Sequence, residues 1–410
     1  MKNKLHTAGR ILYEDGPVSL LSSVQDFFSI RASSYPANIM ASRIFWNAIN
    51  NTEFRTRIAS ETFSYTEGGE FEINESNSKR DLPDEIQSYC RTYSASPLVA
   101  SVLQDAIIND SSVVLTKDGR LISESIGHSK YALYKRIRRK IRESPVKSIP
   151  NLRTDTYADL IPEATAQVEL GFFMIRSGSY FHWVTEFLPN LRALQVYETT
   201  TGNTPAILVE KDPPDWILEY FKIAGYENSV KPLPSSTISA KQLILPPRRI
   251  RIGRNYNPCP RDLVWVRDYF TERVPDITNS YGSRIYISRN DAENRQVVNE
   301  SELVNELEKR GFESIELSDL SVSEQIDIFR DVDFVVGAHG AGFTNTIFAD
   351  STSIFELFPE KGVRHFYYCL AQQLDFDYDF SICPQTTNGD LLVDVETVVE
   401  RVDDFVKASR

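Results

Sequence analysis

The chain of 410 residues has few cysteines and no long apolar run. Its four cysteines form neither a CxxC pair nor the paired spacing of a zinc site, so we expect reduced, mostly buried thiols and no disulfide framework. No window approaches about 18 uncharged apolar residues. Glu14 and Asp15 stand where a signal peptide needs an unbroken apolar segment. We therefore expect neither secretion nor a membrane span, and predict a cytoplasmic protein.

Several motifs of common enzyme classes are also missing. No GxGxxG follows a first strand, which counts against an NAD-dependent oxidoreductase. Neither GxSxG nor GxxxxGK[ST] is present to support a hydrolase or a P-loop NTPase.

The chain has no excess of positive charge. Its net charge of −12 disfavours general nucleic-acid binding, and we predict no nucleic-acid partner. Arginine nevertheless outnumbers lysine by 30 to 15. Bidentate contacts to phosphate or carboxylate would explain this bias, and genome composition explains it equally well. At roughly 100 to 200 residues per domain, the length predicts two or three domains.

The last third of the chain has the most regular pattern. Asn299 with Glu302, and Ser321 with Glu324, are typical of helix N-termini. Strands alternate with these helices, and the alternation predicts a parallel, doubly wound sheet and the α/β fold class. The predicted strands cover residues 284–288, 312–317, 334–338 and 354–358, and the helices cover residues 300–310, 322–330 and 393–408.

The middle of the chain contains further elements. Pro189 predicts two helices that meet at a bend, FHWVTEF and PNLRALQVY, and Asp118-Gly119 predicts the turn of a hairpin. We interpret the polar residues 68–85 as a surface excursion or linker. The remaining predictions are a strand at residues 206–210, a helix at 216–224, a crossing between domains at 231–254 that contains a strand at 242–245, and helical patches at 19–30 and 44–50.

Residues 130–142, KYALYKRIRRKIR, predict a basic amphipathic helix. Such a helix can lie on an anionic membrane surface or hold an anionic partner. It can equally be a solvated helix that packs its apolar stripe on the core.

The strand at residues 334–338 leads into a loop of small residues, His339-Gly340-Ala341-Gly342, followed by Asn345. Glycines let a backbone approach a ligand closely, and free N–H groups at a helix start favour an anion. The alternative is that the small residues only let the strand pack tightly against a helix.

Arginines follow the first strand of the same predicted sheet. Ser288 and Arg289 end that strand and Arg295 comes shortly after, so Arg289 and the His339 loop are expected to meet over one diphosphate. A surface ion pair with Asp291 or Glu293 is the alternative for Arg295. Inside the last strand, Glu356 either accepts hydrogen bonds from a sugar diol or has a structural role.

His182 and Glu186 are spaced i, i+4 and share one face of the FHWVTEF helix. A carboxylate beside a histidine can act as a general base, with the imidazole orienting it or the acceptor. A salt bridge on the helix surface is the alternative. The aromatic neighbours Phe181, Trp183 and Phe187 favour partial burial, which makes the pair a candidate site.

These pieces together resemble glycosyltransferase family 61, of the capsular-polysaccharide-biosynthesis type, which has the GT-B fold of two facing Rossmann-like domains. The ordered set spans residues 113–395 and is specific, although each piece alone is weak. It consists of Tyr180-Phe181-His182-Trp183 with Glu186 and Leu188-Pro189, Tyr286-Ile287-Ser288-Arg289 with Arg295 and Asn299-Glu300, Leu320-Ser321 with Glu324-Gln325, the run Gly337 to Gly342 with Asn345, and Glu356-Leu357-Phe358-Pro359.

The resemblance implies an inverting transferase that needs no metal or other cofactor and takes a nucleotide-diphosphate sugar, most often a UDP-sugar. Glu186 would be the base, where related eukaryotic members generally have Asp, with His182 in reserve. Glu356 would lie near the ribose or base. The residues expected to hold the nucleotide sugar are Ser288, Arg289, Arg295, His339, Gly340, Ala341, Gly342 and Asn345.

Residues 1–95 carry no such resemblance, and we expect them to form a helical or irregular extension. From the resemblance we expect an acceptor-side domain over 96–232, a donor-side domain over 233–390, and a helix in 391–410 that crosses back to the acceptor side. The expected acceptor is a glycan or lipid-linked glycan, and residues 130–142 would hold the enzyme at the cytoplasmic membrane face. The DFDYD segment, residues 375–379, resembles a metal motif, but its place in an alternating strand favours a structural role. A non-catalytic carbohydrate- or nucleotide-binding module on the same fold is the rival interpretation.

Overall fold

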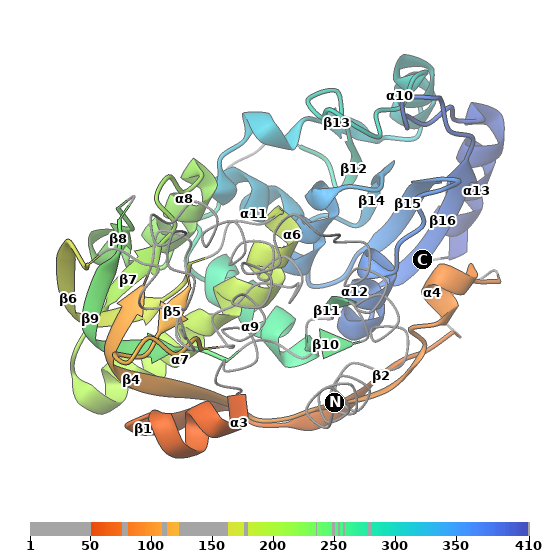
Figure 1. The fold of residues 1–410 in the computed structure, drawn as a ribbon. Coiled ribbons are helices and arrows are strands. Elements are labelled where there is room, and N and C mark those ends of the chain that lie inside the picture. The colour runs from red at the N-terminus through yellow and green to blue at the C-terminus, as the bar shows by residue number, and fades with distance from the viewer. Residues whose placement is uncertain are drawn as a thin grey trace, which may run out of the picture.

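Two β-sheets with helices between and around them organise the part of the chain that the computed structural model describes (Figure 1). The described residues are 51–75, 81–108, 113–122, 163–175, 179–234, 236–247, 251–252, 255–256, 259–277 and 281–408. The predicted helices at residues 19–30, 44–50 and 130–142 lie outside them. The fold class is α/β, as predicted. No helix of the described residues is both long and apolar enough to span a membrane.

The C-terminal sheet is entirely parallel, in the order β13-β12-β14-β15-β16. Every residue of β14 and β15 is buried, which explains their nearly continuous apolar sequences. Chain order reverses between β12 and β14, and such a reversal is the usual ligand position in a doubly wound sheet. Its strands are β12 (Arg284–Ile287), β13 (Glu313–Ile315), β14 (Phe334–Ala338), β15 (Ser353–Pro359) and β16 (Asp377–Cys383), joined by α10 (Glu300–Glu308), α11 (Val322–Arg330) and α12 (Phe366–Leu374).

The N-terminal sheet has the order β1-β4-β9-β6-β7-β8, with β5 paired to β4. Its four strands β9, β6, β7 and β8 are parallel neighbours, and β1, β4 and β5 add antiparallel pairs. The predicted hairpin turn is confirmed at Gly119, whose φ is 78°. The strands are β1 (Glu61–Thr66), β4 (Leu98–Ile108), β5 (Val114–Leu115), β6 (Ala166–Phe173), β7 (Ala206–Val209), β8 (Val230–Pro232) and β9 (Ile238–Leu245), with helices α3 (Asn51–Glu53), η1 (Phe54–Ile58), α7 (Leu191–Thr201), α8 (Asp215–Ile223) and η7 (Glu227–Ser229).

Two of the expected domain boundaries are wrong. β9 lies between β4 and β6, so the segment expected to be the crossing between domains provides a central strand of the first sheet. β1 also belongs to this sheet, although residues 1–95 were expected to form a separate extension. The strand predicted at residues 242–245 is confirmed as part of β9, but its Pro- and Arg-rich surroundings gave no sign that it belongs to the first sheet, where Leu243 and Ile244 are fully buried.

The polar segment expected to be a surface excursion begins with a packed hairpin instead. β2 (Gly69–Ile73) pairs with β3 (Arg91–Ala95), and α4 (Asp84–Gln87) lies between them in sequence. The hairpin extends from the first sheet to α12 (Figure 1), where the Tyr368 hydroxyl donates to the Asn74 carbonyl. Only alternate residues of β2 face the protein, so its composition remains polar although Ile73 is 1% exposed.

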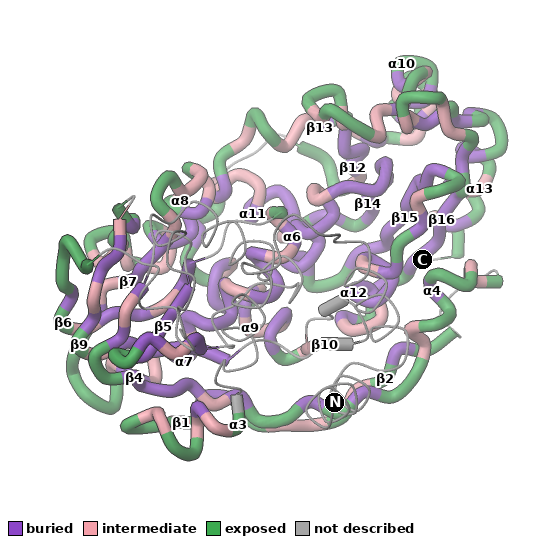
Figure 2. Tube along the Cα trace, viewed as in Figure 1, coloured by how far each residue is buried: buried purple, intermediate pink, exposed green. Residues whose placement is uncertain are grey.

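One continuous hydrophobic core joins the two sheets. Phe172 and Ile207 from the first sheet belong to the same buried cluster as Ile285 and Val335 from the second. Figure 2 shows this buried interior running through the middle of the molecule. Helix α9 (Pro260–Thr271) packs there against α11 and α12. The two halves of the fold are therefore held together by apolar contacts between their elements.

Helix α13 (Val395–Ala408) stays with the C-terminal sheet, which corrects the expected crossing back to the acceptor side. Its Val398, Val402 and Phe405 belong to a buried cluster with Phe334 and Phe355 of that sheet. The apolar stripe of α13 packs on this sheet, next to α10, so the described helix stays in the C-terminal half of the fold.

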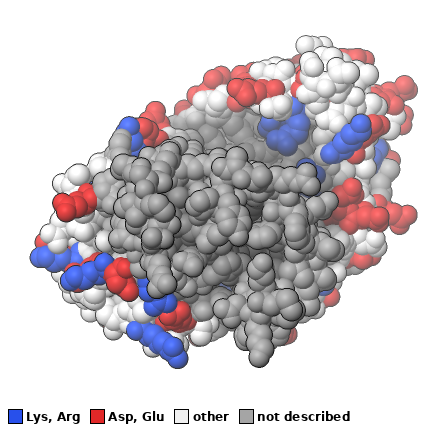
Figure 3. Space-filling view, viewed as in Figure 1, with Lys and Arg blue, Asp and Glu red and all other residues white. Residues whose placement is uncertain are grey.

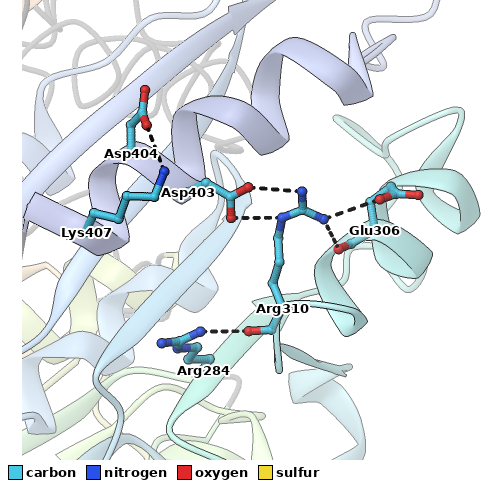
Figure 4. Close-up of polar contacts among 6 residues, drawn as sticks. All are labelled: Arg284, Glu306, Arg310, Asp403, Asp404 and Lys407. Atoms are coloured by element: carbon cyan, nitrogen blue, oxygen red, sulfur yellow. Dashed lines mark hydrogen bonds and ion pairs between the residues drawn. The ribbon is translucent and has the colours of Figure 1, made fainter.

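Polar contacts fasten α13 further. Arg310 donates to both oxygens of Asp403, at 2.9 and 3.0 Å, and to the Glu306 carbonyl at 2.8 Å (Figure 4). On the other side, Arg401 donates to Asp379 at 3.1 Å. Asp379 belongs to the DFDYD segment, so this contact supports the structural role predicted for that segment.

Only one of the two predicted N-terminal caps forms. Ser321 and Glu324 make a complete capping box at the start of α11, as predicted. At α10 the Asn299 side chain makes no cap bond and instead pairs with the backbone of Val393, at 2.8 and 3.0 Å. Asn299 thus ties α10 to the segment before α13.

The Arg310–Asp403 contact predicts a stability difference between two adjacent carboxylates (Figure 4). We expect Asp403→Asn to lower the free energy of unfolding by about 1 kcal/mol, because it breaks a bidentate, partly buried ion pair. Asp404→Asn is the matched control, since Asp404 meets only the exposed Lys407 at 3.4 Å. Urea denaturation of both variants measures the difference, and equal midpoints would contradict the prediction.

Candidate functional site

The two groups of candidate residues lie where chain order reverses in each sheet. Arg289 follows β12 and His339 follows β14, the two strands at the reversal point of the C-terminal sheet. In the N-terminal sheet, β6 has β7 on one side and β9 on the other, and the chain leaves β6 toward α6 (Tyr180–His182). Loops diverge at such points and leave room for a ligand between them.

Arg289 lies directly against the backbone of Gly340. A Cβ atom on Gly340 would come within 1.9 Å of Arg289 Nη1, so any other residue at this position would require the guanidinium to move. Arg289 Nη2 donates to the Asn294 carbonyl at 2.9 Å, and this bond fixes the plane of the guanidinium. The predicted meeting of the arginine and the His339 loop is present in the structure.

Arg295 places a second positive charge near Arg289. Burial and the neighbouring Arg295 lower the pKa of the Arg289 guanidinium, and the charge of Asp291 acts in the opposite direction. Within the described parts of the chain neither arginine has a carboxylate at ion-pair distance, and the Nε atoms of both are buried without a partner. The surface ion pair considered for Arg295 is therefore not found. Figure 3 shows a group of basic side chains at the upper right of this face, with acidic ones nearby.

His339 is held from behind by two residues of the C-terminal sheet. Its Nδ1 shares a hydrogen bond with Glu356, and the other carboxylate oxygen of Glu356 accepts from the Tyr378 hydroxyl at 2.6 Å. Because Glu356 is fully buried and both its oxygens are used, it orients His339 and does not reach a ribose. This supports the structural alternative for Glu356.

The loop after His339 begins a 3₁₀ helix, η9 (Ala341–Phe348). The first N–H groups of any helix have no acceptor within it, so those of Ala341 and Gly342 are available to an anion. Gly342 has a packing role as well, because a Cβ there would come within 2.7 Å of Leu317. The packing interpretation therefore applies at Gly342, and binding of an anion by this loop stays a prediction.

His182 and Glu186 form a hydrogen-bonded dyad. His182 Nδ1 lies 2.5 Å from Glu186 Oε1. The carboxylate is 5% exposed and the imidazole 30% exposed, so the histidine is the member nearer to solvent. Glu186 lies in a short π-helix, η5 (Trp183–Phe187), which is followed by η6 (Leu188–Asn190) and the bend predicted at Pro189. Such π-turns are frequent at functional sites.

Aromatic rings connect the dyad with the arginine pair. The ring of Phe366 lies 6.0 Å from that of His182, and Tyr367 lies 5.6 Å from Phe181 and 5.5 Å from His339. Burial raises the pKa of Tyr367, while the charges of Arg289 and Arg295 act in the opposite direction. Helix α12 thus contacts the dyad through Phe366 and the His339 loop through Tyr367.

Two predicted binding residues lie behind this site. The Asn345 amide accepts from the Tyr180 hydroxyl at 2.6 Å and donates to Gln325 at 2.7 Å. The Ser288 hydroxyl donates to Glu300 at 3.2 Å. Both residues are buried and their polar groups are used within the protein, Asn345 as a link between α6 and η9.

Residues that sequence reasoning missed include Tyr180, Tyr367 and Phe366. Tyr180 adjoins His182 in the motif, but its hydrogen bond to Asn345 joins positions 165 residues apart, and no local pattern reveals such a partner. The two α12 aromatics have the ordinary pattern of a buried helix. Only the folded chain distinguishes them from core residues.

The contact between Gly340 and Arg289 makes a specific prediction. Gly340→Ala should displace the guanidinium and weaken binding of UDP by about tenfold or more, the effect of losing a charged hydrogen bond. Gly69→Ala is the matched control, because its Cβ also meets an arginine, Arg261, at 2.8 Å and in an exposed place. Calorimetric titration with UDP should separate the two variants, and equal affinities would contradict the placement of Arg289 at the site.

Comparisons with known proteins address the family. Residues 180–355 match the sequence model of the family described as Glycosyltransferase 61. No curated protein is similar enough in sequence to count as a relative. Solved structures that match include the dodecameric iron-containing heptosyltransferase TibC in complex with ADP-D-β-D-heptose, at 9% identity and a TM-score of 0.31, covering 87% of this chain and 98% of that one. At that level of likeness neither residues nor ligands transfer between the two chains.

The family match contains both groups of candidate residues, the dyad at its beginning and the His339 loop near its end. It is shorter than the ordered motif set, which extends beyond it on both sides. It supports glycosyltransferase activity as the broad function. The match over residues 180–355 supports the resemblance to glycosyltransferase family 61 that the ordered motifs indicate.

Proposed function

We propose that the protein is an inverting glycosyltransferase that moves a sugar from a nucleotide-diphosphate sugar to a hydroxyl of a glycan or lipid-linked glycan. The observation that carries this proposal is the pair Arg289 and Arg295, two half-buried cations that have no carboxylate partner among the described residues. Like charges held together at low solvent exposure need an anion to balance them. A diphosphate is the anion we propose, because Arg289 lies against Gly340, directly before the N–H groups at the start of η9.

The dyad supports the acid–base half of the reaction. His182 is the more exposed member, and buried Glu186 holds its Nδ1. This geometry favours His182 as the group that receives the acceptor's proton and Glu186 as the carboxylate that orients it and stabilises the imidazolium. Direct proton removal by Glu186 is the other arrangement, and the two make different predictions for the His182 variants.

In the proposed reaction the acceptor oxygen attacks the anomeric carbon from the face opposite the diphosphate. The new bond joins that oxygen to the anomeric carbon, and the bond from the anomeric carbon to the phosphate oxygen breaks. The acceptor proton goes to the dyad, and the electron pair of the broken bond goes to the diphosphate. Arg289 and Arg295 stabilise the charge that develops there, with the N–H groups of Ala341 and Gly342.

UDP as the nucleotide, independence from metal, and a capsular or lipid-linked acceptor come from the family resemblance alone and stay predictions. The same is true of a cytoplasmic location at the membrane face, because residues 130–142 lie outside the described residues. The cationic groups named above can take the place of a divalent ion at the leaving diphosphate, which is why we propose a metal-independent reaction.

Substitution of the dyad tests the mechanism. Glu186→Gln should lower kcat by about 100-fold or more, because the amide cannot stabilise an imidazolium, and should leave the UDP dissociation constant within a few-fold. Glu198→Gln is the matched control, since Glu198 is a half-buried glutamate on α7 that pairs with Tyr226. Steady-state kinetics and UDP titration measure both. His182→Gln should be as damaging as Glu186→Gln, whereas a nearly normal His182→Gln enzyme would assign the base to Glu186 itself.

A panel of UDP, GDP and dTDP and their sugars tests the substrate class. At about 100 times the dissociation constant a bound nucleotide stabilises the fold by about 2.7 kcal/mol, which a thermal unfolding scan detects. We expect the UDP compounds to protect best, Arg295→Gln to abolish the protection, and Arg273→Gln, a cation stacked on Tyr269, to retain it.

The same preparation, treated with EDTA, should keep its transfer activity and slow donor hydrolysis. A strict requirement for Mn²⁺ would refute metal independence. Protection by UDP without any turnover would instead identify a binding module on this fold.

A further inference from the structure

His365 is a buried histidine with no role in the proposed chemistry. It precedes α12 as its N-cap residue and is 2% exposed. Its ring stacks on Tyr89, with centroids 3.5 Å apart and planes inclined by 7°, and it touches the ring of Phe366 at 4.5 Å. Tyr89 comes from the segment between β2 and β3, so the two halves of the chain hold this imidazole from different sides.

The Nε2 atom of His365 has no hydrogen-bond partner among the described residues. A buried polar atom without a partner costs about 1 to 3 kcal/mol, whereas a phenylalanine would fill the same stack without that cost. The rest of the ring packs in the same way as the ring of an aromatic core residue. The unpaired nitrogen is therefore the feature that packing does not explain.

The position of His365 is next to the proposed reaction centre. Phe366, its immediate neighbour, contacts the rings of Phe181 at 5.0 Å and His182 at 6.0 Å. Tyr367, the next residue of α12, lies 5.5 Å from the ring of His339. His365 thus adjoins the two residues of α12 that contact the dyad and the His339 loop, and we place the transferred sugar near these residues.

The electrostatic state of His365 identifies the kind of group it can contact. Burial, together with Arg364 and His339, lowers the pKa of the His365 imidazole to about 3. The ring is therefore neutral at neutral pH and offers one N–H and one lone pair. A neutral imidazole suits a sugar hydroxyl, which both donates and accepts, better than a phosphate, which needs positive charge.

We propose that His365 is a specificity-determining residue for the donor sugar. Its Nε2 pairs with a hydroxyl of the transferred sugar, while Tyr89 holds the imidazole ring in place. This inference rests on the proposed function, since it needs a nucleotide sugar at the site. It goes beyond that function because it selects among sugars that carry the same nucleotide. A site that pairs with one hydroxyl discriminates strongly against a sugar that lacks it or presents it on the other face.

The test is His365→Phe, which keeps an aromatic ring in the stack and removes the nitrogen. We expect its midpoint of thermal unfolding to stay equal or rise, its UDP affinity to be unchanged, and its KM for the preferred UDP-sugar to rise by about tenfold or more. Its preference between that sugar and the epimer at the contacted hydroxyl should fall by a similar factor. Thr237→Val is the matched control. Like His365→Phe, it removes a buried polar atom that lacks a partner, here the Thr237 hydroxyl beside β9, far along the chain from His365. That variant should gain stability without any change in KM.

The outcomes separate the two proposals. Unchanged KM and unchanged sugar preference in His365→Phe would overturn the role of His365 while leaving the proposed function intact. Wild-type protein that neither binds UDP nor hydrolyses a donor would instead overturn the proposed function.

A measurement on the wild-type chain covers the case in which His365→Phe does not fold. The chain has only five histidines, so their resonances can be told apart in protein labelled with ¹⁵N-histidine. Addition of the UDP-sugar should shift the His365 Nε2 resonance, and addition of UDP alone should not. His365→Gln assigns that resonance. A resonance that responds equally to UDP and UDP-sugar would also refute the proposal.

Discussion

The site depends on one electrostatic constraint, which is that Arg289 and Arg295 are held together without a carboxylate among the described residues. The backbone makes this arrangement possible at two places. Gly340 leaves the space that the Arg289 guanidinium occupies, and the Asn294 carbonyl fixes its plane. Arg295 itself has a φ of 61°, a left-handed conformation that costs an L residue free energy. Stability is thus given up locally to keep positive charge unbalanced where a diphosphate would bind.

The net charge of the chain gives no indication of this local pair of positive charges. At −12 the chain is acidic, and Figure 3 shows acidic side chains on the same face as the basic ones. Screening in water confines each of those charges to about 10 Å or less, while half-buried arginines are screened much less. The local field at the ends of β12 and β14 is therefore set by the few cations there. Overall composition excludes general nucleic-acid binding and leaves a specific anion site open.

Much of the second half of the fold could be predicted from local patterns, because its strands are buried on both faces and its helices carry start signals. β14 and the Ser321 capping box are examples. The first half was harder, since β9 is a central strand inside a Pro- and Arg-rich segment and β2 exposes every second residue. Asn299 illustrates another limit, because its side chain pairs with the backbone of Val393 from a distant segment and does not make the predicted cap bond.

The candidate site likewise has a part that could be predicted from the sequence and a part that could not. Residue type and strand position were enough to bring Arg289 and the His339 loop together, because the carboxyl ends of neighbouring parallel strands meet at one edge. They were not enough to tell which polar groups are already used within the protein. Glu356 and Asn345 are satisfied by Tyr378 and Tyr180, which only the tertiary structure shows. The contact between Tyr89 and His365 is of the same kind.

The hairpin of β2 and β3 has a consequence for how the protein is made. Its anchor on α12, the bond from Tyr368 to Asn74, joins positions 294 residues apart. During synthesis the hairpin emerges early, but the surface that it covers is made only after nearly the whole chain has been translated. Contacts of such long separation form slowly and late in folding. The stack of Tyr89 on His365 forms at this same junction, so the complete site is assembled among the last steps of biogenesis.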